Sequence, residues 1–245
     1  MIKDPYSKYN NLHLLAIVVF TILLSSCSSK DSSLIAWWDF DAINENIVQD
    51  RSGNNLHALG YNALFAPGKN GKAFYSNGTN YLQVKYTPKL DDFKRGLTLS
   101  VWIYRDRDAG NDYNCIITRQ IRNTISEYFD IAILKNKPLF AIDPDGNHYH
   151  QTDYKDSLLL HQWYHLAGTF DNTTYTLFIN GKPVASGEQR LPFHFDDKNP
   201  VIIGSNTNDQ GKIMHDNFYG LIDELKIFNR ALTSNEIMAI FKKDN

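Results

Sequence analysis

The segment DPDGNHYHQTDYKD, residues 143–156, gathers side chains whose types could do chemistry. Its Asp carboxylates could bind a metal ion, its His rings could move protons, and its Tyr rings could stack on sugars. A calcium loop of the EF-hand type requires Gly at its sixth position and Glu at its twelfth. Counted from Asp143, those positions hold His148 and Tyr154, so the segment is not such a loop. The DPDG at its start instead predicts a type I turn.

The residues after this turn are typical of a loop that binds carbohydrate. Tyr149 and Tyr154 could stack on the C–H faces of sugar rings, while His148 and His150 could hydrogen-bond to sugar hydroxyls. The two His residues also share a face of an extended segment, but two ligands alone make a poor metal site. An ordinary solvated loop has the same composition, so both interpretations stay open.

A second segment, YRDRDAGNDYN at 104–114, has a similar mixture of aromatic and charged residues. Tyr113 could add a second ring to the site, and the guanidinium of Arg105 would suit a carboxylated or sulfated glycan. We therefore expect the loops 104–114 and 143–156 to form the rim of one polysaccharide-binding site. Charges of alternating sign are also typical of a solvated surface.

Catalytic groups are less evident than binding groups. A retaining glucanase needs two carboxyl groups roughly 5 Å apart. The chain has no E-x-D-x-x-E cluster, and its Glu residues are spread along the sequence at Glu45, Glu127, Glu188, Glu224 and Glu236. A lyase could be assembled from Tyr149, His148 and His150 together with Arg119 and Arg122, so a polysaccharide-degrading enzyme remains an alternative. No nucleophile-elbow motif supports a Ser-His-Asp hydrolase.

Length and composition place these loops on a globular protein. The chain has 245 residues, of which 42% are hydrophobic and 13% aromatic, enough for one large β domain or two small ones. Its formal net charge of −2 gives no basic field, so we expect no nucleic-acid partner.

The N-terminus has the features of an export signal. Two Lys residues precede the apolar run LLAIVVFTILL at 14–24, which is too short to span a bilayer. The following Leu24-Ser25-Ser26-Cys27 resembles the bacterial lipobox, in which signal peptidase II cuts before the Cys and the Cys is acylated. We therefore expect a lipoprotein signal peptide at 1–26, a lipidated tether at 27–33 and one domain at 34–245. The alternative is an ordinary signal peptide with an incidental Cys.

Strand-like segments with polar breaks fill the rest of the chain. Asn180-Gly181, between TYTLFI and KPVASGE, is a strong signal for a two-residue hairpin. One short C-terminal helix is expected over SNEIMAIFKK, capped by Thr233 or Ser234. The pattern predicts an all-β, two-sheet antiparallel sandwich or jelly roll. The other expected strands are LIAWWDF (34–40), KAFYS (72–76), NYLQVKY (80–86), GLTLSVWIYR (96–105), YNCIITRQ (113–120), EYFDIAIL (127–134), PLFAI (138–142), QWYHLAGTF (162–170), PVIIG (200–204) and GLIDELKIF (220–228).

Several of these segments, taken in order, carry a family resemblance. AWWDFD, APGKNGKAFYSNGTNYLQV, QWYHLAGTFDNTTYTLFINGKPVAS and FYGLIDELKIFNRALTSNEIMAI resemble the LamG-like jelly-roll family within the concanavalin A-like lectin and glucanase superfamily. The resemblance runs from about residue 36 to 241. It implies two stacked antiparallel sheets with a concave face, and often a calcium ion near the edge of the sandwich. Fold does not fix function, so the resemblance leaves the activity open.

One structural calcium ion is the cofactor that we expect. Asp223 in GLIDELKIF lies, by strand alternation, on the same face as Leu225, and a carboxylate on an apolar face must be paired or bound to a metal. The resemblance implies that this strand lies beside the N-terminal one, where Asp41 and Asp50 arrive as further oxygen ligands. Alternatively, Asp223 accepts backbone hydrogen bonds and Asp50 caps a turn.

Three functions are compatible with the sequence. The first is a lipoprotein of the cell envelope, anchored by lipid to the outer membrane on its periplasmic or surface side, that binds a polysaccharide without catalysis. The second is a polysaccharide lyase or glycoside hydrolase of the same fold. The third is a protein-interaction module with envelope protein partners, since LamG-like domains also bind proteins. The first explains the aromatic and polar loops together with the missing catalytic carboxylates.

Overall fold

The computed structural model describes residues 31–108, 112–121, 124, 126–195, 197–207 and 214–245. The predicted signal peptide at 1–26 and Cys27 lie outside these residues. Within these ranges, no helix has the length and apolar character that crossing a bilayer requires.

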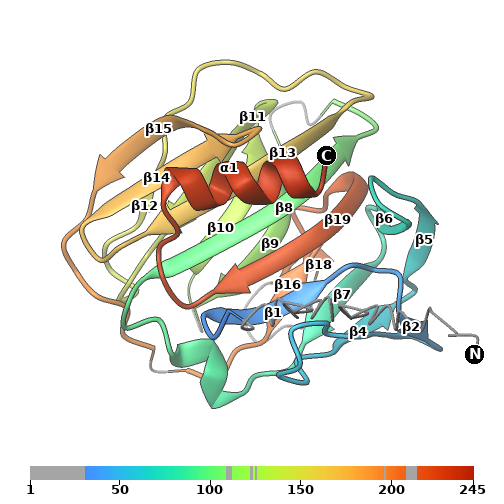
Figure 1. Ribbon diagram of the computed structural model, residues 1–245, viewed down its shortest axis with the longest axis horizontal. Helices are drawn as coiled ribbons and strands as arrows, with labels where there is room; N and C mark the ends of the chain where they lie inside the picture. The colour runs from blue at the N-terminus through green and yellow to red at the C-terminus, as the bar shows by residue number, and fades with distance from the viewer. Residues whose placement is uncertain (1–30, 109–111, 122–123, 125, 196, 208–213) are drawn as a thin grey trace, which may run out of the picture. The chain divides into compact units, whose positions relative to one another are not determined.

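Two antiparallel sheets make up the described domain (Figure 1). The eight-stranded sheet has the order β15-β14-β13-β8-β19-β6-β5, and β1 also pairs with β19. Its strands are β1 (Leu34–Trp38), β5 (Leu64–Pro67), β6 (Lys72–Asn77), β8 (Leu97–Arg105), β13 (Trp163–Phe170), β14 (Thr174–Ile179), β15 (Lys182–Glu188) and β19 (Tyr219–Phe228).

The nine-stranded sheet has the order β12-β11-β10-β9-β16-β7-β4-β3-β2. A separate two-stranded ribbon pairs β17 (Asn206–Thr207) with β18 (Met214–His215), and a 3-10 helix spans Pro88–Asp91. The strands of the large sheet are β2 (Ile43–Asn44), β3 (Ile47–Val48), β4 (Ala58–Tyr61), β7 (Tyr81–Val84), β9 (Tyr113–Gln120), β10 (Glu127–Leu134), β11 (Lys137–Ile142), β12 (His150–Gln151) and β16 (Val201–Ile203).

The expected sandwich is therefore confirmed, and its core lies between the two sheets. Leu97, Leu99, Val101 and Ile103 alternate along β8 and are fully buried in one hydrophobic cluster with residues of both sheets. The hairpin at Asn180-Gly181 is confirmed as well, because Ile179 pairs with Lys182 and both turn residues have positive φ.

The outer face of the eight-stranded sheet is covered by α1 (Ser234–Lys243), which lies across the strands in Figure 1. The ring of Phe241 packs 5.5 Å from that of Trp102 on β8 and 6.0 Å from that of His165 on β13, measured between ring centroids.

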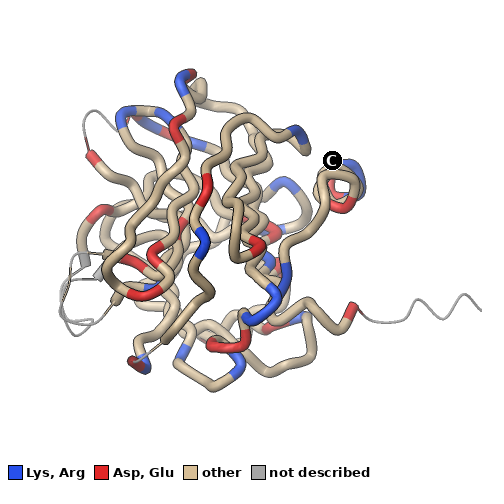
Figure 2. The backbone as a smooth tube through the Cα atoms, turned by 90° about the vertical axis from the view of Figure 1, so that its left-hand side faces the viewer, with Lys and Arg blue, Asp and Glu red and all other residues tan. Residues whose placement is uncertain are grey.

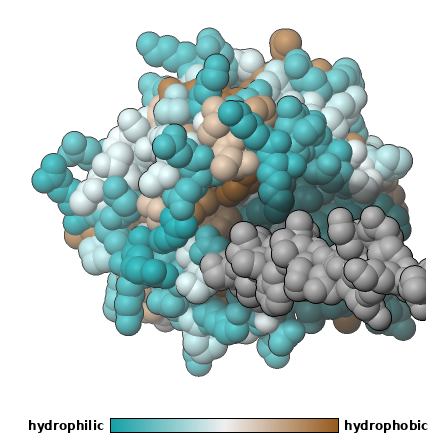
Figure 3. All heavy atoms as spheres, viewed as in Figure 1, coloured by the Kyte–Doolittle hydropathy of each residue, from teal (hydrophilic) through white to brown (hydrophobic). Residues whose placement is uncertain are grey.

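Figure 3, which views this side, shows a mostly hydrophilic surface with a short hydrophobic band near its centre. Figure 2 shows Lys and Arg interspersed with Asp and Glu along the described backbone.

One face assignment made from the sequence is wrong. Asp223 pairs with Trp102 and shares its outward face, whereas Leu225 is in the core. The cause is a β-bulge between Asp223 and Lys226, where Glu224 adopts a φ of +50°. The extra residue reverses the alternation, so strict counting along β19 fails at this point.

Candidate functional site

The nine-stranded sheet carries polar residues on the face turned away from the core. Along β10, Phe129, Ile131 and Ile133 belong to the core cluster, so Asp130 lies on the opposite face. The register places Asp130 beside Thr118 of β9 and beside Ala141 of β11. This face is built from three neighbouring strands and the segment that follows β11.

Two tyrosines lie near the carboxyl group of Asp130. The hydroxyl of Tyr113 donates a hydrogen bond to Asp130 Oδ2. Tyr149 interacts with Tyr113 and places its own hydroxyl 3.2 Å from Gln151 Oε1. The side chain of Asp130 is fully buried, whereas Tyr149 is 39% exposed. The two loops that we expected to share a site therefore meet through Tyr113 and Tyr149.

A second carboxyl group lies near the first. Asn206 donates a hydrogen bond of 2.6 Å to Oε1 of Glu127, which is also buried. Burial raises the pKa of Glu127 to about 7, and the charge of Asp216 adds to this effect while that of His215 opposes it. Burial also raises the pKa of Asp130 well above its ordinary value, and the neighbouring Glu127 raises it further.

We refer to Tyr113, Glu127, Asp130, Tyr149 and Asn206 as the tyrosine–carboxyl site. Its half-exposed Tyr149 ring is suited to stack on the apolar face of a sugar, and the polar groups around it are suited to orient hydroxyls. Its two carboxyl groups are suited to proton transfer in principle. Asp130, however, has no exposed surface with which to contact a reacting atom.

Three other predicted residues lie around the same loop but face different neighbours. His148 is exposed, and its Nδ1 lies 2.9 Å from Asp145 Oδ1, so the two side chains contact each other at the start of the loop. The His150 ring is centred 5.9 Å from that of Tyr175 on β14. Tyr154 is partly buried against the core. Their roles in ligand binding stay predictions.

Arg105 does not lie on an exposed rim, and the expected position is wrong for this side chain. It is 2% exposed and donates a hydrogen bond of 2.7 Å to the carbonyl oxygen of Leu158. It also donates to the side chain of Asn136. The guanidinium thus ties the end of β8 to the turn before β11 at Asn136 and to the segment after β12 at Leu158, where it serves the fold.

The expected metal ligands all accept hydrogen bonds from the backbone. Asp50 Oδ1 accepts from Trp37 N–H at 3.0 Å and from Ser52 N–H at 2.8 Å, as expected for a turn cap. Asp41 Oδ1 accepts from Lys72 N–H at 2.7 Å. Asp223 Oδ2 accepts from Asn70 N–H at 3.0 Å, and burial raises the pKa of Asp223 to about 7.

Asp41 and Asp223 thus hold the same segment, 70–72, whereas Asp50 holds a different one. In the part of the chain that the structure describes, no group of three or more His, Cys, Asp and Glu side chains could hold a metal ion. The three carboxylates therefore do not form the single ligand set expected from the sequence, and calcium stays a prediction.

Sequence reasoning missed Glu127, Asp130 and Asn206. The signal for Asp130 was present, because it is the charged residue inside the apolar strand EYFDIAIL. A carboxyl group in such a strand must find a partner or a function. Glu127 and Asn206 carried no comparable signal, since they are 79 residues apart in the sequence and meet only through a side-chain hydrogen bond in the folded chain.

Comparisons with known proteins bear on this geometry. A family model, Laminin_G_3, described as the concanavalin A-like lectin/glucanases superfamily, matches residues 76–238. Domain 4 of AbnA, an extracellular arabinanase from Geobacillus stearothermophilus solved with arabinotriose, is 21% identical with a TM-score of 0.65. That match covers 85% of this chain and 98% of the other. A comparison with curated proteins found no match.

The binding domain of botulinum neurotoxin DC is also similar. Its complex with SialylT and its complex with rat synaptotagmin II each match at 17% identity with a TM-score of 0.68, covering 89% of this chain. The chain spans about half of these toxin chains, 53% in each case. At such identities the likeness to the solved structures shows the fold alone.

Proposed function

The chain belongs to the Laminin_G_3 family of the concanavalin A-like lectin/glucanase superfamily, and from this premise we propose that it binds a polysaccharide without cleaving it. We place the binding site at the tyrosine–carboxyl site. The observation that carries the proposal is the half-exposed Tyr149, held beside Tyr113 on the free face of the nine-stranded sheet. An aromatic ring among fixed polar groups is a usual arrangement for recognising a sugar.

The structural relatives support a binding role of this kind. Domain 4 of AbnA was solved with arabinotriose, and the neurotoxin binding domain with SialylT. The same neurotoxin domain was solved with rat synaptotagmin II, which is the observation that favours a protein partner as the second candidate function. The sugar-binding role is preferred because the tyrosine–carboxyl site combines one partly exposed ring with several hydrogen-bonding groups.

The absence of catalysis is also part of the proposal. Glycoside hydrolysis by two carboxyl groups requires both to reach the scissile bond or a water molecule beside it. The pKa of Glu127, raised to about 7, would suit a general acid, which is what favours the enzyme alternative. Asp130 is fully buried under Tyr113, so it is badly placed as a nucleophile or base.

We further propose that the protein is a lipoprotein of the cell envelope, anchored through an acylated Cys27. The support is the apolar run followed by Leu24-Ser25-Ser26-Cys27 in the sequence. An envelope location would place the domain next to polysaccharides of the cell surface or periplasm, and it also permits envelope protein partners.

Tyr149→Ala tests the sugar-binding role. The variant should lose ~1–2 kcal/mol of binding free energy, tenfold or more in affinity, because it loses the apolar area that covers a sugar ring. Affinity electrophoresis against a panel of polysaccharides measures the loss. Tyr149→Phe, which keeps the ring, should retain most of the binding, and Leu159→Ala, at a residue 65% exposed, should behave as the wild type.

The outcomes separate the candidate functions. Retention of Tyr149→Ala equal to that of the wild type on every polysaccharide would remove this site. New reducing ends or unsaturated products, abolished in Glu127→Gln, would show an enzyme instead. A wild type that is retained by no polysaccharide but binds an envelope protein would favour the protein-interaction function.

A further inference from the structure

A row of apolar and aromatic side chains crosses the outer face of the eight-stranded sheet. Residues directly opposite one another in a sheet point to the same side. The register pairs Leu64 with Tyr75, Tyr75 with Leu221, Leu221 with Tyr104 and Tyr104 with Trp163. Leu64 is 45% exposed, and the other four side chains are partly exposed. We refer to these five residues as the apolar row.

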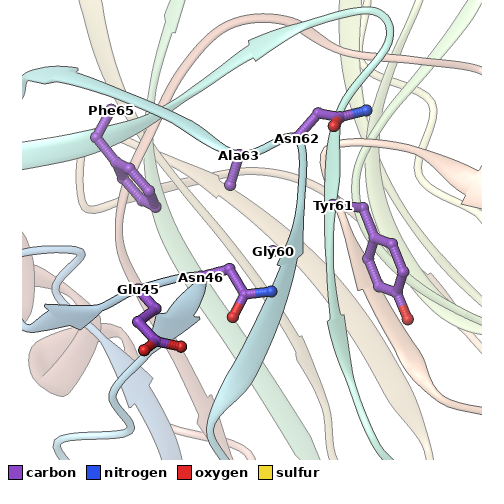
Figure 4. A pocket seen from close by; sticks show the side chains of 7 residues that line it. All are labelled: Glu45, Asn46, Gly60, Tyr61, Asn62, Ala63 and Phe65. Carbon is purple, nitrogen blue, oxygen red and sulfur yellow. The ribbon is translucent and has the colours of Figure 1, made fainter.

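Both ends of the apolar row face away from the core. Along β8, Ile103 belongs to the core cluster, so Tyr104 lies on the opposite face. At β5, Ala63 and Phe65 pack against the core cluster and line a pocket of about 450 Å³ on that side of the sheet (Figure 4). Leu64, between them, therefore points to the outside.

The helix α1 covers the neighbouring row and leaves this one open. Phe241 packs on Trp102 and His165, which pair with each other in the sheet. Tyr104 lies two residues beyond Trp102 on β8, roughly 7 Å further at 3.4 Å per residue. The helix thus borders the apolar row at β8 and β13. Figure 3 shows a short hydrophobic band on this side of the molecule.

Polar groups border the apolar row on its other side. Asn77 pairs with Tyr219, whose carbonyl oxygen accepts a hydrogen bond of 3.1 Å from the N–H of Asp106. The guanidinium carbon of Arg107 lies 3.2 Å from the centroid of the Tyr219 ring. Burial raises the pKa of Tyr75, and the charge of Asp106 beside it raises this pKa further. An amide, a carboxylate and a guanidinium thus lie next to the row.

The apolar row is long, and its rings are held by their neighbours. The Tyr104 ring is centred 5.7 Å from that of Trp163 and 6.1 Å from that of His161. A ring that is already held loses little conformational entropy when a ligand packs against it. Four strand spacings separate β5 from β13 in the order β13-β8-β19-β6-β5, about 19 Å at roughly 4.8 Å each. Several consecutive units of an extended sugar chain fit along this length.

We propose that the apolar row is a second polysaccharide-binding surface, which takes an extended neutral chain lying across the strands. This inference rests on the proposed function for its class of ligand, but not on the tyrosine–carboxyl site. Tyr104 and Trp163 stack on the apolar faces of sugar units, while Asn77 and Asp106 hydrogen-bond to their hydroxyls. The charges of Asp106 and Arg107 are opposite, so the surface offers no net charge that would select an acidic chain.

Two binding surfaces on opposite faces have a measurable consequence. The core lies between the two sheets, so the apolar row and the tyrosine–carboxyl site face away from each other across the sandwich. A straight chain cannot touch both surfaces, whereas two chains can bind at the same time. The protein should therefore cross-link a polysaccharide. Loss of either surface should leave binding intact at the other and remove the cross-linking.

The experiment titrates the full-length protein with linear arabinan, unsubstituted xylan and mixed-linkage β-glucan, each also as its hexasaccharide. Calorimetry measures stoichiometry, and light scattering measures cross-linking of the polymer. For the glycan that the wild type binds, Tyr104→Ala and Trp163→Ala should each reduce hexasaccharide stoichiometry from two to one and abolish cross-linking. Binding by the remaining surface in Tyr149→Ala should not weaken with added salt, because no ion pair forms with a neutral chain.

The controls separate loss of stacking from loss of folding. Tyr104→Phe keeps the ring and should keep both sites. Thr176→Ala, at a partly exposed residue on the outer face of β14 but outside the row, should behave as the wild type. Thermal melts identify any variant that fails to fold, and Trp163→Ala gives the same test if Tyr104→Ala does not fold.

The failures are distinguishable. If folded Tyr104→Ala and Trp163→Ala bind and cross-link as the wild type does, while Tyr149→Ala loses binding, the second surface is wrong and the proposed function stands. If only the two row variants lose binding, the row is supported and the tyrosine–carboxyl site is wrong. A wild type that binds none of the glycans would remove both proposals. Binding at the row that weakens with added salt would contradict a neutral ligand.

Discussion

At the level of single residues, the buried carboxyl group of Glu127 couples the stability of the fold to pH. Its pKa is raised by burial from 4.5 to about 7 in the folded protein. The folded state therefore holds more protons than the unfolded state between these values, and stability falls as pH rises through this range. The shift corresponds to roughly 3 kcal/mol at about 1.4 kcal/mol per pKa unit.

Glu127→Gln should remove this pH dependence. The amide oxygen of Gln can still accept the hydrogen bond from Asn206, so the site keeps its geometry. Relative to the wild type, the variant should gain stability steadily from pH 5 to pH 8, by up to roughly 3 kcal/mol. Urea unfolding at each pH measures the difference.

Two comparisons make this result specific. Glu188→Gln, at an exposed carboxyl group on β15, should show no such gain. The buried His165, whose pKa burial lowers to about 3, gives stability that rises with pH up to about 6.5, but it contributes equally to both proteins and cancels in the difference. A constant difference between Glu127→Gln and wild type across the range would contradict the assignment.

Asp223 offers a residue-scale test of the predicted calcium. Asp223 and Asp41 both hold the segment 70–72, so a cation bound there would link β19 to this segment. Chelation should then lower the melting temperature of the wild type, because a ligand at a hundredfold excess over its Kd stabilises by about 2.7 kcal/mol. Asp223→Asn should melt at the temperature of the chelated wild type and no longer respond to chelator.

The opposite result has an equally clear physical basis. Without a cation, Asp223 is a buried carboxyl group whose pKa is raised from 3.8 to about 7, so the stability of the fold falls as pH rises through this range and the loss is complete at pH 8. Asp223→Asn would then be at least as stable as wild type at pH 8, and chelator would change neither protein. Thermal melts with elemental analysis for bound calcium distinguish the two cases.

At the level of elements, the sequence left the cap of the C-terminal helix open between Thr233 and Ser234. The structure shows Thr233 as the N-cap, with a capping box in which its side chain accepts from Glu236 N–H and Glu236 accepts from Thr233 N–H. The helix α1 is then held on the sheet by Phe241. Capping fixes where the helix begins, and so which of its residues reach Trp102.

Thr233→Ala should therefore cost ~1 kcal/mol of unfolding free energy, because backbone N–H groups of the first turn lose their acceptor. Ser234→Ala is the matched control, since this residue is already helical and should change stability by less than about 0.5 kcal/mol. Denaturant unfolding measures both. Equal effects of the two substitutions would contradict the observed cap.

The elements that the sequence predicts well are those with local signals. The hairpin at Asn180-Gly181 and the helix over 234–243 depend on turn and cap residues that are adjacent in the chain. The bulge at Glu224 has no such signal, because Glu is not a residue that favours positive φ. The short strands β2–β5 were likewise missed, since their pairing partners and not their own residues define them.

At the level of the whole molecule, the family and the two-sheet fold were predictable, but the site was predictable only in part. Tyr113 and Tyr149 were identified from two loops, and the structure brings them together. Asp130 was not identified as a site residue, because it joins the site only once β9 and β10 pair and place it on the outer face of the sheet. Arg105 was misplaced because its buried hydrogen bonds to Leu158 and Asn136 link distant segments.

The attachment of the molecule to a membrane is the remaining whole-molecule prediction, and it depends on Cys27, outside the described residues. The apolar run 14–24 would extend only about 16 Å as a helix, at 1.5 Å per residue, against roughly 30 Å of hydrocarbon. The run is too short to span the bilayer, and cleavage of 1–26 removes it. A protein that is retained at the membrane afterwards therefore needs another anchor. An acyl chain supplies about 0.8 kcal/mol per buried CH₂, and stable anchoring takes more than one chain.

Cys27→Ala should abolish both processing before residue 27 and incorporation of labelled palmitate, and should change the membrane fraction in which the protein is found. Cys115→Ala is the matched control, because Cys115 is fully buried in β9 and burial raises its pKa, so it is unsuited to acylation. That variant should be processed and labelled as the wild type. Normal labelling and unchanged processing in Cys27→Ala would show that the lipobox interpretation is wrong, while leaving the polysaccharide-binding proposal for the domain 34–245 to its own test.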